Sequence, residues 1–281
     1  MKYLVLSNGN SLPIVGLGTW QIRDRELLRK LIKKAYASGY RMLDTAAAYS
    51  NEIGVAKAIR ENEIPREEIY IIDKVWNTCR GFEEVQDACK NSLKKLKTEY
   101  LDLYLIHYPA SPKSDENWNK INAETWRGME KLYREGYVKA IGVCNYKIHH
   151  LEELKKTYEI CPMVNQIELH PGLFDVDMYK YCQEKGIILQ AASPLGNGQI
   201  LHNEKLKEIA RKRERSVAQI CLKWEIQKNI SVIPKTSNLQ RLEENIEIFD
   251  FELTEEETDI IDKIPYCGGL NIDSDEVIKF E

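Results

Sequence analysis

The feature that most constrains this sequence is a regular alternation of short apolar runs with longer segments whose apolar residues recur at helical spacing. The short runs have the length and the β-branched content of buried strands, and they cover Ile14–Thr19, Arg41–Asp44, Tyr70–Lys74, Leu101–His107, Ala140–Cys144, Val164–Glu168, Ile187–Ala191 and Ser231–Pro234. The amphipathic segments cover Arg25–Ser38, Glu52–Asn62, Phe82–Lys97, Asn119–Glu135, Leu151–Tyr158, Val176–Lys185, Ser216–Gln227 and Leu239–Ile246. This rhythm predicts an α/β protein of repeated strand–helix units.

Two architectures can be built from such units, an open doubly wound sheet and a closed barrel. The open sheet of a dinucleotide-binding protein carries a GxGxxG turn followed by an acidic residue, and this sequence has none. We therefore expect a single domain over residues 1–281, folded as an (α/β)8 TIM barrel with extra helices. An Asn8-Gly9 dipeptide ahead of the first run predicts an N-terminal β-hairpin with a type I′ turn.

Composition narrows the class of partner. Forty Lys and Arg residues stand against forty-four Asp and Glu, a formal charge of −4, which gives no reason to expect nucleic acid or a membrane surface. No run approaches the roughly 20 apolar residues that span a bilayer, and no signal peptide is evident, so we expect a cytoplasmic protein. Seven scattered cysteines without ligand spacing favour reduced thiols and no metal site.

Polar residues end several of the apolar runs. In a TIM barrel the carboxyl ends of the strands carry the active site. Asp44, Lys74 and His107 end three runs, and Asn145, Gln166 and Glu168 belong to or follow two others. Tyr49 comes five residues after Asp44. Together an acid, an amine, a phenol and an imidazole can polarise and protonate a carbonyl group.

Eight collinear motifs make the resemblance to a family specific. They are GLGTW (Gly16–Trp20), LDTAAAYSNEIGVAKAI (Leu43–Ile59), KVW (Lys74–Trp76), LDLYLIHYP (Leu101–Pro109), IGVCNY (Ile141–Tyr146), VNQIELHP (Val164–Pro171), SPLG (Ser193–Gly196) and IPKTSNLQRLEEN (Ile233–Asn245). Spread over nearly the whole chain, they resemble the aldo-keto reductase superfamily, in particular its short-loop, bacterial-type members.

The resemblance implies a catalytic tetrad of Asp44, Tyr49, Lys74 and His107. Tyr49 would give a proton to the carbonyl oxygen as hydride arrives from NADPH, which reduces a small aldehyde or ketone to an alcohol. A Lys74 ammonium beside the phenol would lower the pKa of Tyr49 from its ordinary value of about 10. Asp44 would hold Lys74, and His107 would donate a hydrogen bond to the substrate oxygen.

The resemblance also implies the cofactor and substrate contacts. Residues matching cofactor positions are Thr19, Asp44, Cys144, Asn145, Gln166, Ser193, Leu195, Lys235, Thr236, Asn238, Arg241, Glu244 and Asn245. Arg241 matches the position associated with the adenosine 2′-phosphate, so NADPH is expected in preference to NADH. Trp20, Trp76 and Tyr108 would line the substrate pocket, and the C-terminal loop after Pro265 would set its width.

Four positions depart from the common pattern of the family. Cys144 replaces a serine, Ala192 an aromatic residue that stacks on the nicotinamide, and Tyr108 a tryptophan. Asp73 precedes Lys74 where threonine or serine is usual; strand alternation predicts that it points away from the tetrad.

Two other functions stay open at this stage. A barrel lysine can form a Schiff base, although a neighbouring carboxylate keeps Lys74 protonated. The barrel can also be a regulatory or redox-sensing subunit that binds the cofactor with little catalysis, which Cys144 and Ala192 make conceivable. A small-molecule carbonyl substrate and a monomer are the expected partner and state.

Overall fold

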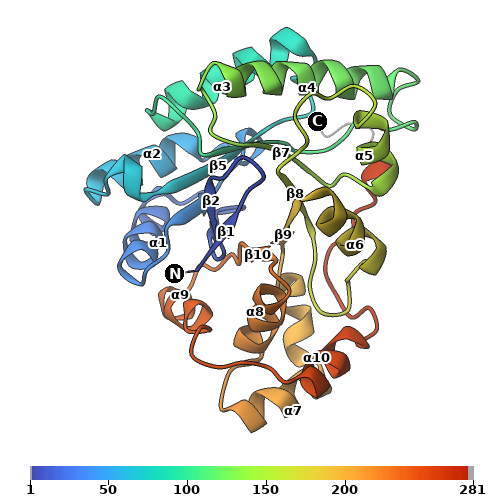
Figure 1. Cartoon of the computed structure of the whole chain (residues 1–281). Helices are drawn as coiled ribbons and strands as arrows, with labels where there is room; N and C mark the ends of the chain where they lie inside the picture. Colours follow the sequence, from blue (N-terminus) through green and yellow to red (C-terminus); the bar gives the residue numbers. More distant parts are fainter. Residues whose placement is uncertain (1, 278–281) are drawn as a thin grey trace.

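Eight parallel strands form the inner layer of the protein and helices surround them (Figure 1). The structure, a computed structural model, describes residues 2–277. The strands pair in chain order from β3 to β10. Their bounds are β3 (Leu17–Gly18), β4 (Met42–Asp44), β5 (Tyr70–Val75), β6 (Leu103–Ile106), β7 (Ile141–Cys144), β8 (Val164–Glu168), β9 (Ile188–Ala192) and β10 (Ser231–Val232).

The last strand meets the first, so the sheet closes on itself. Val15 and Val232 form a parallel bridge, and the amide of Val232 donates to Ile14 O at 2.8 Å. The amide of Gly16 donates to Val232 O, also at 2.8 Å. A side chain at Gly16 would lie 2.6 Å from Met42 Cε and 2.9 Å from Met42 Cγ inside the barrel, so any larger residue at this seam would displace Met42. The expected (α/β)8 barrel is confirmed.

Helices cover the outside of the barrel, as the amphipathic spacing predicts. Their bounds are α1 (Arg25–Ala37), α2 (Glu52–Glu61), α3 (Phe82–Leu96), α4 (Trp118–Arg134), α5 (Ile148–Leu154), α6 (Val176–Lys185), α7 (Glu204–Arg213), α8 (Val217–Gln227), α9 (Leu239–Ile246) and α10 (Glu255–Asp262). In α1 the Asp24 carboxylate accepts hydrogen bonds from the amides of Glu26 and Leu27, and Leu28, Leu31, Ile32 and Ala35 form its buried face. Among the described residues no helix has the length and apolarity that crossing a membrane requires.

Three helices differ from the sequence-based expectation. α5 begins at Ile148 rather than Leu151, because His150 Nδ1 accepts the Lys147 amide and starts the helix earlier. α7 and α10 are not among the expected segments. Thr254 and Glu257 form a capping box at the start of α10, a signal that is readable in the sequence.

The N-terminal hairpin pairs β1 (Tyr3–Val5) with β2 (Ser11–Pro13) and lies across one end of the barrel, in dark blue in Figure 1. The expected type I′ turn is wrong. Gly9 has φ +86°, whereas Asn8 does not have the positive φ that a type I′ turn requires. The Gly9 amide donates to Leu6 O and the Leu6 amide to Asn10 O, which describes a three-residue loop with glycine in the left-handed position.

Buried polar side chains connect the hairpin end of the barrel to its opposite end. Gln166 Nε2 donates to Gln190 Oε1 at 2.7 Å, and Gln190 Nε2 donates to Ser231 Oγ at 3.0 Å. The Ser231 hydroxyl donates to Pro13 O. Because these side chains satisfy one another, they fix the inward direction of Gln166 toward the carboxyl ends of the strands.

Candidate active site

Four of the polar residues predicted from the strand ends meet at the carboxyl end of the barrel. Asp44 ends β4, Lys74 lies near the end of β5, and His107 follows β6. Tyr49 ends η1 (Ala47–Tyr49), a short 3-10 helix just after β4. Consecutive barrel strands therefore bring the predicted tetrad together.

Lys74 is at the centre of the hydrogen bonds that join this group. Its Nζ lies 2.7 and 2.6 Å from the two oxygens of Asp44 and 3.0 Å from Thr45 O. Its remaining contact is with Tyr49 Oη at 3.3 Å. Lys74 and Asp44 are both buried, and burial alone would lower the pKa of Lys74. The Asp44 carboxylate more than offsets the effect of burial, so the pKa of Lys74 is raised. The amine is therefore a permanent cation directed at the phenol.

Burial of its phenol raises the pKa of Tyr49, and the Lys74 ammonium offsets that effect only in part. The expected net lowering of this pKa is thus wrong, because the loss of hydration outweighs the nearby charge. Tyr49 keeps its proton at neutral pH. A protonated phenol that contacts a fixed cation is in the state that a proton donor needs, and the cation stabilises the phenolate left behind.

His107 faces the same space as a neutral imidazole. Burial lowers its pKa well below the ordinary value, and Lys74 lowers it further. The Tyr49 ring packs edge-on at 5.7 Å between ring centroids, and the Trp76 ring at 5.0 Å. Among the described residues His107 Nδ1 has no hydrogen-bond partner. These contacts hold the ring so that it can donate a hydrogen bond to an oxygen beside Tyr49 without carrying charge.

A cavity of about 330 Å³ opens over Tyr49 and His107. The expected substrate residues Trp20, Trp76 and Tyr108 all line it, together with Asn145. The His107 and Tyr108 rings stack at 5.5 Å between centroids, with 14° between their planes. Aromatic and aliphatic side chains together make up most of the cavity wall, which suits a compact, apolar molecule.

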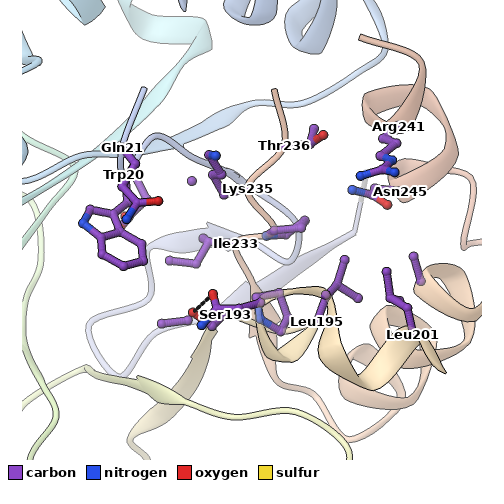
Figure 2. Close-up of a pocket in the computed structure, with 18 of the residues that line it drawn as sticks. Trp20, Gln21, Ser193, Leu195, Leu201, Ile233, Lys235, Thr236, Arg241 and Asn245 are labelled. Atoms are coloured by element: carbon purple, nitrogen blue, oxygen red, sulfur yellow. Dashed lines mark hydrogen bonds between the residues drawn. The ribbon is translucent and has the colours of Figure 1, made fainter. Parts of the chain in front are cut away.

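A second, longer cavity of about 810 Å³ runs from Tyr49 across the end of the barrel to α9. Figure 2 shows Trp20 and Gln21 at one end of it and Arg241 and Asn245 at the other, with Lys235 between them. The expected cofactor residues that line it are Asp44, Gln166, Ser193, Leu195, Lys235, Thr236, Arg241, Glu244 and Asn245. An elongated cavity with two cationic side chains suits a dinucleotide with its phosphates.

Four other expected cofactor residues lie elsewhere. Asn145 lines only the smaller cavity, with Nδ2 donating to His107 O at 2.9 Å. Thr19 is buried, and its hydroxyl donates to Asp44 O at 2.8 Å. Cys144 is buried and lines neither cavity, while Asn238 uses its carboxamide oxygen to cap α9. Thr19 and Cys144 are therefore buried beside the tetrad without lining either cavity, whereas Asn238 is exposed at the start of α9.

The four residues that depart from the family pattern lie in different environments. Ala192 is half-buried at the end of β9 and lines both cavities. Burial raises the pKa of the Cys144 thiol, which is therefore neutral beside Lys74. Burial raises the pKa of Tyr108 to about 12. Asp73 points away from the tetrad, as strand alternation predicts, and its neighbours are Glu52 and Ser92 on the surrounding helices.

Several lining residues are not identifiable from the sequence. Glu168, Leu270 and Ile272 line the smaller cavity, and Asn197, Gln199 and Leu201 of η3 (Gly196–His202) line the larger one. The sequence marks Glu168 as a strand-end residue but gives it no role. Leu270 and Ile272 lie in the C-terminal loop that the resemblance places at the pocket, but no spacing or motif singles out these two residues or the three of η3.

Comparison with known proteins agrees with this geometry. The model of the Aldo/keto reductase family matches residues 14–265. Glyoxal reductase of Bacillus subtilis is 44% identical over 273 residues, which cover 97% of this chain and 96% of the relative. Methylglyoxal reductase DkgA of Escherichia coli K12 is 38% identical over 273 residues, 96% of each chain.

A solved structure shares the fold over almost the full length. It is the crystal structure of a Gox0644 mutant in complex with NADPH, is 33% identical to this chain, covers 99% of both chains and has a TM-score of 0.91. The family match, the curated reductases and the shared barrel lead to one conclusion. The chain is an oxidoreductase that belongs to the aldo-keto reductase family.

Proposed function

We propose that this protein reduces small aldehydes and ketones to alcohols with NADPH, and that Tyr49 is the proton donor. The observation that carries the proposal is the hydrogen-bonded series Asp44–Lys74–Tyr49, which ends in a small, largely apolar cavity beside a long cavity lined by Lys235 and Arg241. When bound, the nicotinamide supplies hydride. The residues of this chain supply the remaining steps.

Each tetrad residue has one task. Tyr49 releases its proton to the substrate oxygen, and the Lys74 ammonium stabilises the phenolate that remains. Asp44 keeps Lys74 charged and fixes its position. A neutral His107 donates a hydrogen bond to the same oxygen and orients the carbonyl group.

The long cavity supports NADPH in preference to NADH. Lys235 and Arg241 are its two cations, and they lie after β10 and in α9, on the side of the barrel that often binds phosphate. A guanidinium recognises a phosphate through paired N–H donors, so Arg241 suits a 2′-phosphate. The 330 Å³ cavity and the glyoxal and methylglyoxal reductases among the relatives favour small carbonyl substrates.

The proposal is tested with Tyr49→Phe, which keeps the ring and removes the transferable proton. We expect turnover of small aldehydes, followed as NADPH oxidation, to fall about a hundredfold or more, while NADPH binding is unchanged. Tyr108→Phe is the matched control, because it removes a hydroxyl from the same cavity outside the tetrad, and it should retain most activity. A wild-type protein that binds NADPH but oxidises it with no carbonyl compound would refute the proposal and favour the regulatory alternative.

A further inference from the structure

A strap formed by residues 267–277 crosses the carboxyl end of the barrel and closes one side of the smaller cavity. Leu270 and Ile272 supply this wall, and the two residues are 47% and 46% exposed. Such exposure is high for two large apolar residues beside a catalytic tyrosine. It leaves them able to contact an apolar group of a molecule in the cavity.

One carboxylate fixes the strap at this point. Glu168, the last residue of β8, accepts a hydrogen bond from the Leu270 amide at 2.7 Å through Oε1. Its Oε2 accepts from the Asn271 amide at 2.6 Å. Two short, charge-assisted bonds to consecutive amides set both the height and the direction of the strap above the strand.

The fit between the strap and Glu168 is close. Gly269 has φ +103°, and a side chain there would lie 2.5 Å from Glu168 Oε1 and 2.6 Å from His170 Nε2. Only glycine allows the backbone to approach the carboxylate this closely. The backbone conformation of the strap at Gly269 is therefore the one that the contact with Glu168 requires.

A second anchor lies farther along the strap, away from the cavity wall. Lys147 pairs with Asp273 and lies 2.8 Å from Asp275 Oδ2. Ser111 Oγ donates to Asp275 O at 2.9 Å. This anchor holds the end of the strap when Glu168 is altered, so loss of the first anchor should displace Leu270 and Ile272 without freeing the whole segment.

We propose that Glu168 is a positioning residue for substrate: through its two bonds to the strap it places Leu270 and Ile272 against the apolar group next to the carbonyl. The ligand class is thereby an aldehyde or ketone with an uncharged aromatic or branched substituent. This inference rests on the proposed reductase function. Glu168 touches no atom that reacts, and its effect is on substrate affinity.

The test compares Glu168→Gln and Glu168→Asp with wild type on two neutral substrates, 4-nitrobenzaldehyde and the much smaller methylglyoxal. Glutamine offers one acceptor and one NH2 group, which would face an amide N–H, whereas aspartate keeps both acceptors on a shorter stem. We expect KM for 4-nitrobenzaldehyde to rise about five- to tenfold in Glu168→Gln, and less in Glu168→Asp, with kcat unchanged. KM for methylglyoxal and the NADPH Kd should stay at wild-type values.

A second variant and a direct measurement separate the position of the strap from general damage. Leu270→Ala leaves Glu168 and its two bonds in place but removes part of the wall, so it should raise the same KM. Amide hydrogen exchange at residues 270 and 271 should be faster in Glu168→Gln and unchanged in Leu270→Ala. Lys113→Ala, which removes an exposed pair with Glu276 at the far end of the strap, should leave both readouts unchanged.

The outcomes are distinct. An equal rise in KM for both aldehydes, or a fall in kcat alone, in Glu168→Gln would overturn the proposal. So would unchanged exchange at residues 270 and 271. If the wild-type protein reduces neither aldehyde, the reductase function itself fails, whereas the exchange measurement still decides whether Glu168 fixes the strap.

Discussion

At position 73 a carboxyl group lies on the helical side of β5, in a fully buried place. Burial, with a smaller contribution from the Glu52 carboxylate of α2, raises the pKa of Asp73 from 3.8 to about 7. A polar contact with Ser92 of α3 and the charge of Lys74 lower it only in part. Cys89 of α3 and Tyr104 of β6 also face this carboxyl group. Asp73 is therefore a buried carboxyl group whose ionisation destabilises the folded protein.

Asp73→Asn should therefore stabilise the protein in a pH-dependent way. Between pH 4 and pH 7 the folded chain keeps a proton that the unfolded chain releases, so the contribution of Asp73 to the free energy of unfolding falls as pH rises through this window. Asparagine removes this loss. The advantage of the variant over wild type should grow by about 1–3 kcal/mol from pH 5 to pH 8, measured by denaturant unfolding.

The control for this experiment is Asp87→Asn, which neutralises an exposed carboxylate on the neighbouring helix α3. Its unfolding free energy should run parallel to that of wild type over the same pH range. A constant offset between Asp73→Asn and wild type from pH 5 to pH 8 would mean that Asp73 already ionises in the folded protein at pH 5.

Ala192 is the second residue whose effect can be measured on its own. It lines both cavities where the family pattern has an aromatic ring. We expect Ala192→Tyr to tighten NADPH binding about two- to tenfold, because an offset stack contributes about 0.5–1.5 kcal/mol beyond burial. Fluorescence titration gives the Kd. Ala192→Leu adds apolar surface without a ring face; equal tightening by leucine would show that area, not stacking, is responsible.

At the scale of elements, prediction from sequence succeeds where one face of a segment is buried. The apolar residues of α1 recur at helical spacing, and those of β5 form a short continuous run, so each element can be predicted from its own residues. The first barrel strand, β3, is shorter than the expected run Ile14–Thr19. Its missing part pairs with Val232 of the last strand, β10, through the bridge at Val15 and the hydrogen bond from the Gly16 amide. The tetrad is predictable once the strands are predicted, because the carboxyl ends of barrel strands converge and bring the residues that follow them together.

What sequence cannot supply is the contribution of the loops. Glu168 is visible as a strand-end residue, but its partners are backbone amides of Leu270 and Asn271, and a backbone amide has no signature in sequence. The expectation for the pKa of Tyr49 is wrong for a related reason. Its charged neighbour Lys74 can be read from the motif, whereas the loss of hydration depends on packing from several strands.

The molecule as a whole has one seam, where β3 meets β10, and the long cavity crosses it. Residues from both sides line the cavity: Gly18 and Trp20 from the start of the chain, and Ile233 and Lys235 from the end. A ligand that contacts both sides would hold the barrel closed. Binding to the folded state alone stabilises it by about 2.7 kcal/mol when the ligand concentration is a hundred times its Kd.

We therefore expect NADPH at saturating concentration to raise Tm by roughly 5–10 °C. NADH at the same concentration should raise Tm less, because under the proposed function Arg241 would pair with the 2′-phosphate that only NADPH carries. Amide exchange at Gly16 and Val232 should slow when NADPH is bound. In Arg241→Ala the difference between the two cofactors should narrow. Arg127→Ala, which removes an exposed arginine that pairs with Glu124 on α4, should leave it intact. Equal shifts from NADPH and NADH in the wild-type protein would show that Arg241 does not discriminate between them, and would place the preference, if one exists, elsewhere in the cavity.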